Sequence, residues 1–290
     1  MNNKLRYLLK HGLRAGMRQA LVRIATRYRF TRLVPEPQAA EIESANLCNL
    51  RRIHCTRTNH FIPGAKSMDE GTLPRDRFTV ILQQFPFLRN VTLQGLAEPF
   101  LNPDIFNIIT LAKSKGISVG LATNGTLLSA KTAEHLLAAG AGAYDDFVLS
   151  LDSFNTGTGE SIRPPAGFDR ITENVITQMG RLRMAAAQAA ETAQRLGISF
   201  NYYKLDGHVW SRHETLHPCW SLWNYPYITW NGYVTPCCAQ PYPEEFNIGN
   251  LFDTPFSTIR QYTEYRAFRK ALSGGNIRQL CHGCPHNIFR

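Results

Sequence analysis

The chain has 290 residues, of which 43% are hydrophobic and 19% charged. This length allows one large domain, or a main domain with a small one, and this composition excludes a disordered or fibrous protein. No apolar run in the sequence is long enough to span a bilayer, so we do not expect the chain to be an integral membrane protein. Seven cysteines without a secretory signal favour a reducing, cytoplasmic compartment and metal or redox chemistry over a disulfide framework.

The net charge of +10 belongs to the N-terminal segment. Residues 1–35 hold nine basic and no acidic side chains, whereas the remaining residues hold 23 basic and 22 acidic ones. We therefore expect no nucleic-acid partner. Apolar side chains recur at helical spacing and predict a basic amphipathic helix within residues 1–37: Leu5, Leu9, Leu13, Met17, Leu21 and Ile24. Such a helix can pack on the main domain with its arginines in water, rest through residues 1–33 on an anionic membrane, dock on a partner, or serve as a transit peptide.

Strand and helix signals alternate through the middle of the chain. We expect strands at 39–44, 89–95, 117–122, 147–151 and 198–203, and helices at 103–116, 129–140 and 168–196. This alternation predicts an α/β fold with parallel strands, in which ligands bind at the carboxyl ends of the strands. The candidate site therefore lies in the segments that follow strands: Cys48–Cys55, Gly95–Pro99, Thr123–Gly125 and Ser150–Ser153.

The last part of the chain differs in composition. Five of the seven cysteines lie between Cys219 and Cys284, and helix signal is confined to 257–272. Two thiolates three residues apart can bind one metal, so we expect Cys281 and Cys284 to share a centre with Cys219 and Cys237, and Cys238 to be a core residue or spare ligand. Structural zinc and an iron–sulfur cluster both suit this set. We expect three parts, at 1–37, 38–208 and 209–290.

These segments, taken together, resemble the radical S-adenosylmethionine (SAM) enzymes. The stretch from Cys48 to Cys55 is similar to their C-x3-C-x2-C cluster loop, with His54 at the place before the last cysteine. Further motifs follow in the family's order, namely Gly95-Leu96-Ala97-Glu98-Pro99, Thr123-Asn124-Gly125, Ser150-Leu151-Asp152 and Ile162-Arg163-Pro164. The C-terminal cysteines resemble the SPASM/twitch extension of that superfamily.

The resemblance implies a partial (β/α) TIM-like barrel of parallel strands with a small C-terminal Fe–S cluster-binding domain. It implies an oxidoreductase that cleaves SAM reductively to a 5′-deoxyadenosyl radical and abstracts hydrogen from a peptide, protein, sugar or nucleoside. The implied cofactors are SAM, a SAM-binding [4Fe-4S] cluster on Cys48 and Cys55, and an auxiliary [4Fe-4S] cluster. An electron donor such as flavodoxin or ferredoxin is the implied partner. The residues implied to bind or orient SAM are His54, Gly95, Ala97, Glu98, Pro99, Asn124, Ser150, Asp152 and Arg163.

One position departs from the family pattern at the cluster itself. Arg52 stands where the family has its middle cysteine, and a protonated guanidinium has no lone pair for iron. Either His54 or His60 substitutes as a ligand, or the chain is an inactive relative that retains only its C-terminal metal centre. The stretch between Asp152 and Cys219 is also short, so either one β/α unit is missing or the long helix breaks near Gly180.

Overall fold

The computed structural model describes most of the chain in two compact units. It describes residues 3–52, 55, 57, 69–142, 145–150, 161–162, 167, 169, 171, 173, 177, 221–238 and 240–273. The first unit contains the described residues within Met1–Ile42, Asp76–Val91 and His213–Arg290. The second contains those within Glu43–Arg75 and Thr92–Arg212. The expected strand at 198–203 and most of the expected helix at 168–196 lie outside the described residues.

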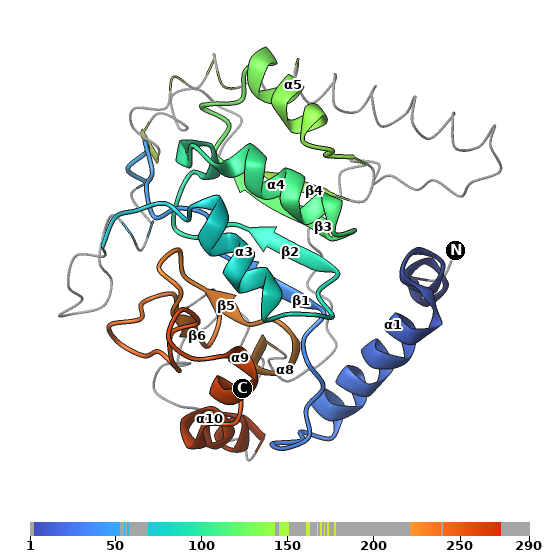
Figure 1. Cartoon of the computed structure of the whole chain (residues 1–290). Helices are drawn as coiled ribbons and strands as arrows, with labels where there is room; N and C mark the ends of the chain where they lie inside the picture. Colours follow the sequence, from blue (N-terminus) through green and yellow to red (C-terminus); the bar gives the residue numbers. More distant parts are fainter. Residues whose placement is uncertain are drawn as a thin grey trace. The chain divides into compact units, whose positions relative to one another are not determined.

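The strands form one open sheet of six, in the order β4-β3-β2-β1-β5-β6 (Figure 1). The bounds are β1 Ala39–Ile42, β2 Asn90–Leu93, β3 Ser118–Thr123, β4 Asp146–Leu149, β5 Tyr227–Ile228 and β6 Val234–Thr235. In the second unit β3 and β4 are parallel, with Thr123 opposite Leu149. In the first unit β1 and β5 are parallel, and the β5–β6 hairpin adds an antiparallel edge. The expected α/β fold with a mostly parallel, unclosed sheet is confirmed.

The helices agree with the sequence in part. Their bounds are α1 Asn3–Arg27, α3 Arg75–Gln83, η1 Pro99–Leu101, α4 Ile105–Ser114, α5 Ala130–Ala138, α8 Ser221–Asn224, α9 Phe256–Ile259 and α10 Thr263–Ser273. The Ser129 hydroxyl caps α5 by accepting from the Thr132 amide at 3.2 Å, as expected from the sequence. The helix signal at 257–272 corresponds to α9 and α10, between which the chain turns at residues 260–262, whereas the short helix α8 lies outside the expected range.

The start of α4 also differs from the expectation. The sequence predicts a helix from residue 103, but the helix begins at Ile105. The Asn102 amide instead donates to the carbonyls of Ser44 and Leu73, at 2.7 and 2.9 Å, and thereby joins two loops of the second unit. The interior of α4 is as expected, since its apolar face, with Ile105, Ile108, Ile109 and Ala112, is buried.

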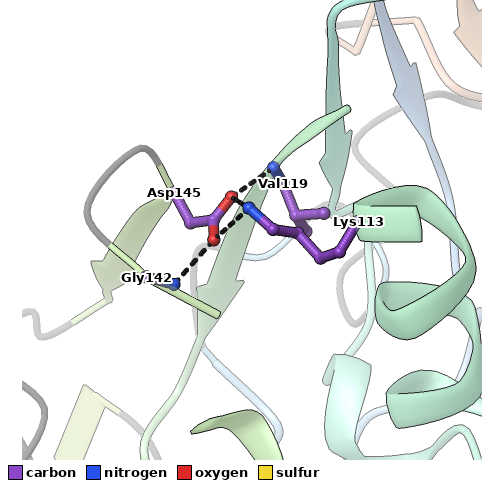
Figure 2. Close-up of polar contacts among 4 residues, drawn as sticks. All are labelled: Lys113, Val119, Gly142 and Asp145. Atoms are coloured by element: carbon purple, nitrogen blue, oxygen red, sulfur yellow. Dashed lines mark hydrogen bonds and ion pairs between the residues drawn. The ribbon is translucent and has the colours of Figure 1, made fainter. Parts of the chain in front are cut away.

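A buried carboxylate fixes the amino-terminal ends of β3 and β4 (Figure 2). Both Asp145 oxygens lie 2.8 Å from Lys113 Nζ on α4. The same carboxylate accepts from the Val119 amide at 2.7 Å and from the Gly142 amide at 2.8 Å. A salt bridge and two backbone hydrogen bonds therefore meet on one side chain, which holds the helix and both strands in register.

The first unit has its own core around the C-terminal helices. Gln84, just after α3, donates to the Leu251 carbonyl at 2.7 Å and accepts from the Phe256 amide at 2.8 Å. Arg269 on α10 is buried, and its Nε donates to the Leu222 carbonyl at 2.9 Å. Desolvation lowers the pKa of Arg269, and the neighbouring Tyr265 opposes this shift. Gln84 and Arg269 thus have their polar groups paired with backbone groups inside this unit.

Candidate functional site

The carboxyl ends of β2 and β3 are joined by one buried side chain, Glu98. Its Oε1 accepts from the Thr123 hydroxyl at 2.8 Å and from the Phe100 amide at 3.3 Å. Its Oε2 accepts from the Asn124 amide at 2.7 Å. The Glu98 amide in turn donates to the Leu47 carbonyl at 2.8 Å, so the same residue holds the loop that leads into Cys48.

Burial raises the pKa of the Glu98 carboxyl, and its hydrogen bonds to Asn124, Thr123 and Phe100 oppose that shift. Both oxygens accept hydrogen bonds from groups of the protein, and the side chain is buried. The carboxylate therefore has a structural role and connects the segments that follow β2 and β3. The groups left at the surface of this edge belong to the preceding turn, where Gly95 and Ala97 are half-exposed. That turn is held by Glu43, whose Oε1 accepts from the Leu96 amide at 3.4 Å.

A cluster of three polar side chains lies against the cysteine loop. Asn124 Nδ2 donates to Asn49 Oδ1 at 3.0 Å and lies 3.9 Å from the Cys48 sulfur. Asn124 Oδ1 accepts from the Thr126 amide and hydroxyl, at 2.9 and 2.6 Å. Asn49 closes the triangle by donating to the Thr126 hydroxyl at 2.8 Å. The turn after β3 and the residues around Cys48 therefore form one hydrogen-bonded assembly.

The end of β4 joins the same edge through its backbone. The Ser150 amide donates to the Thr123 carbonyl at 2.9 Å. Thr123 therefore contacts both neighbours, since its hydroxyl binds Glu98 and its carbonyl binds Ser150. Gly125, with a φ of 81°, permits the tight turn that follows, in which its amide donates to the Thr123 hydroxyl at 3.1 Å.

The structure thus brings together residues that the sequence separates widely. Cys48, Glu98, Asn124 and Ser150 meet at one edge of the second unit, next to Gly95, Ala97 and Pro99. His54, Asp152, Arg163, Cys219, Cys281 and Cys284 lie outside the described residues. Sequence reasoning missed Asn49, Thr126 and Glu43, which hold these loops in place. The only sequence signal for Asn49 is its position beside Cys48.

The cysteine loop supplies two thiolates, Cys48 and Cys55, one fewer than the three of the family's cluster loop. Cys48 and Cys55 are both half-buried, and the Cys55 amide donates to the Arg52 carbonyl at 3.1 Å. Arg52 occupies the third ligand position with a side chain that cannot bind iron. Within the described part of the chain, no group of three or more His, Cys, Asp or Glu side chains is arranged to hold a metal.

At the C-terminal cysteines the structure describes one adjacent pair. Cys237 is half-buried and lies in a bridge with Gln240. Desolvation and then the negative charge of Glu41 raise the pKa of the Cys238 thiol, although the residue as a whole is exposed. Burial and the Glu41 charge thus disfavour the Cys238 thiolate, which is the form that binds metals. Thiolates at Cys219, Cys237, Cys281 and Cys284 are a donor set that fits an iron–sulfur cluster.

The described residues form an open, mostly parallel α/β sheet, with Cys48 at the edge where Glu98 and Asn124 lie. Two family models match the chain: the radical SAM superfamily model over residues 42–177 and an iron–sulfur cluster-binding SPASM domain over residues 219–285. The chain belongs to the radical SAM superfamily and carries a SPASM domain. These domains imply SAM, a SAM-binding 4Fe–4S cluster and an auxiliary iron–sulfur cluster as cofactors, and they support an enzyme.

Two curated relatives illustrate the similarity. An AdoMet-dependent heme synthase from Methanosarcina barkeri is 30% identical over 125 residues, which are 42% of this chain and 34% of the relative. A mycofactocin maturase, MftC, from Mycobacterium tuberculosis is 25% identical over 141 residues, which are 48% of this chain and 34% of the relative. The matched segment thus spans about a third of the length of these relatives.

Two solved structures share the fold. BtrN in an open conformation aligns with a TM-score of 0.54 at 15% identity, covering 86% of this chain and 92% of that one. SuiB of Streptococcus suis bound to the precursor peptide SuiA aligns with a TM-score of 0.52 at 16% identity, covering 86% and 69%. The expected partial TIM-like barrel is confirmed. Among the helices that the structure describes, none is long and apolar enough to cross a membrane.

Proposed function

We propose that this chain is a radical SAM/SPASM enzyme that abstracts hydrogen from a peptide or protein substrate. The carrying observation is the hydrogen-bonded edge where Cys48, Glu98 and Asn124 meet. Its cofactors, when bound, supply an electron that cleaves SAM to methionine and a 5′-deoxyadenosyl radical. SuiB, which has this fold and was solved with a precursor peptide, supports a peptide as the substrate class.

The chain's own residues would orient SAM at this edge. The half-exposed turn at Gly95 and Ala97 offers backbone groups to the amino end of SAM, and Glu98 holds that turn against β3. Asn124, Ser150, Asp152 and Arg163 are proposed to meet the remaining polar groups of SAM. Cys48, Cys55 and His54 are proposed to line the cluster side of the site, and Cys219, Cys237, Cys281 and Cys284 to hold the auxiliary cluster. A flavodoxin or ferredoxin is proposed as electron donor.

Arg52 favours a second candidate function. A loop with two thiolates is one short of the family's three, so a scaffold that keeps only the auxiliary centre is the alternative. The test is an anaerobic assay for 5′-deoxyadenosine with reconstituted, reduced protein and SAM. It compares the native chain, Arg52→Cys, and Arg51→Cys as a matched control that adds a thiol one position away.

The three outcomes separate the candidates. If the native chain forms 5′-deoxyadenosine, the enzyme proposal holds and a residue other than a third cysteine completes the site. If only Arg52→Cys forms it, the site binds SAM but the native chain is the inactive relative. If neither forms it, the scaffold function stands. Activity in Arg51→Cys as well as in Arg52→Cys would show that the added thiol acts independently of its position.

A further inference from the structure

In the part of helix α1 whose side chains are described, four large apolar residues are exposed. Leu13, Met17, Leu21 and Ile24 are 75%, 69%, 54% and 44% exposed. They are spaced by four, four and three residues and therefore lie on one face of the helix. We call these four residues the apolar ridge. The helix that the sequence predicts is present, and of the alternatives left open for its apolar face, packing on the main domain does not apply to these four residues.

A different face attaches α1 to the rest of the first unit. Val22 and Ala25 are buried. The Arg18 guanidinium lies 3.3 Å from the centroid of the Phe87 ring and 3.8 Å from a carboxylate oxygen of Glu36. Among the side chains of α1 that the structure describes, Val22 and Ala25 are the buried ones, and Arg18 adds polar contacts. If attachment were its only role, the larger apolar side chains of the ridge would be the ones buried.

The segment after α1 continues the exposed apolar surface. Tyr28 is exposed, and Leu33 is 96% exposed. Leu33 has a φ of 54°, in the left-handed region that a leucine rarely adopts. Arg260 holds the backbone just beyond it by donating to the carbonyls of Val34 and Pro35, the latter at 3.0 Å. The protein therefore holds Leu33 in a strained backbone conformation with its side chain exposed to solvent. Backbone strain of this kind is typical of sites that contact a ligand or partner.

The charge around the ridge identifies its occupant. Residues 1–35 hold nine basic side chains and no acidic one, and Arg23 and Arg27 are exposed beside the ridge. We propose that α1 docks the protein on the surface of an anionic phospholipid bilayer. The apolar ridge would enter the boundary between headgroups and acyl chains, while the flanking arginines reach lipid phosphates. The occupant has to offer an apolar region to the ridge and negative charge to the arginines. A protein partner would need an acidic groove of matching shape for this, whereas an anionic bilayer offers both its acyl chains and its phosphates.

The test measures binding of the full-length protein to vesicles by flotation. One set contains phosphatidylcholine with roughly one third phosphatidylglycerol, and the other contains phosphatidylcholine alone. The ridge variant is Met17→Gln with Leu21→Gln, which removes apolar surface without changing charge. Its matched control is Val80→Gln with Leu137→Gln, two exposed apolar residues on α3 and α5. A third variant, Arg23→Gln with Arg27→Gln, removes charge and keeps the ridge.

We expect binding to the anionic vesicles only, weakened about tenfold or more in the ridge variant and unchanged in the control. The charge variant should bind more weakly, as should the native protein in about 0.5 M salt. The proposal is overturned if the protein ignores both vesicle types, or binds both equally. It is also overturned if light scattering shows dimers that the ridge variant abolishes while vesicles are not bound, since the ridge is then a contact between copies. This proposal does not depend on radical chemistry, so its failure leaves the proposed function unaffected.

Discussion

Two buried carboxylates at opposite ends of β3 permit a matched test of the site. Glu98 joins the carboxyl ends of β2 and β3, and Asp145 joins the amino ends of β3 and β4. Each accepts short hydrogen bonds from backbone amides, at 2.7 Å from Asn124 and 2.7 Å from Val119. Replacing either residue by alanine leaves buried donors without an acceptor, which costs about 1–3 kcal/mol for each donor.

For Glu98→Ala, the amides of Asn124 and Phe100 and the hydroxyl of Thr123 lose their acceptor, while the buried carboxylate no longer has to be desolvated. We therefore expect a net loss of about 3 kcal/mol in the free energy of unfolding. For Asp145→Ala, two amides and Lys113 lose their partner, and we expect a loss of about 3–5 kcal/mol. Urea denaturation followed by far-UV circular dichroism measures both.

The two variants should differ in SAM binding. Glu98→Ala releases the turn at Gly95 and Ala97 and the segment at Asn124, and we expect SAM affinity to fall by about tenfold or more, which corresponds to 1.4 kcal/mol. Asp145→Ala acts at the far end of the strands, and the folded variant should bind SAM with near-native affinity. Equilibrium dialysis with labelled SAM gives both values. Native affinity in Glu98→Ala, or an equal loss in both variants, would refute the assignment of the site to this edge.

Three further predictions concern stability. Because burial raises the folded-state pKa of Glu98 above the ordinary 4.5, its stabilising contribution is fully present below about pH 4.5 and is lost as pH rises through the folded value. The native protein should therefore exceed Glu98→Gln in urea midpoint by an amount that decreases as the pH rises from about 4. A difference in midpoint that does not change with pH would contradict this prediction. Gly232→Ala should lower the free energy of unfolding by about 2 kcal/mol or more, because φ is +91° and the added Cβ would lie 2.6 Å from the Phe252 ring. Gly116→Ala is the matched control: its φ is also positive, but the added Cβ meets open space, so the loss should be about 1 kcal/mol. Equal losses would refute the steric argument. Asn102→Ala should cost about 2–4 kcal/mol, because two backbone carbonyls lose their donor, and thermal unfolding would show whether the loss is that large.

Local signals predicted elements well where a single physical cause dominates. The apolar period of α4 identified its buried face, the Ser129 hydroxyl marked the start of α5, and Gly116, with a φ of 70°, lies just past the end of α4. The helix α3 was missed, although Pro74 and Asp76 at its start are typical of a helix N-terminus. Its β-branched and aromatic interior carries a weak helix propensity, which tertiary packing of Phe78, Ile81 and Leu82 overrides.

For the site, the order of motifs predicted which segments carry the functional residues. Strand ends separated by tens of residues were expected at one edge, and Glu98, Asn124 and Ser150 do meet there. The sequence did not predict that Glu98 turns both oxygens inward, nor that Asn49 and Thr126 hold Asn124 against Cys48. Hydrogen-bond partners across loops depend on distances that no local pattern encodes.

The sequence by itself determined the family, the parallel α/β architecture, the cysteine positions and the departure at Arg52, because these depend on residue identity, order and period. Only the tertiary structure decided which face of α1 is buried. Helical period defines an apolar face, but packing depends on the neighbouring surface. Here that surface presents Phe87 and Glu36, which together accommodate Arg18 and leave the apolar ridge exposed.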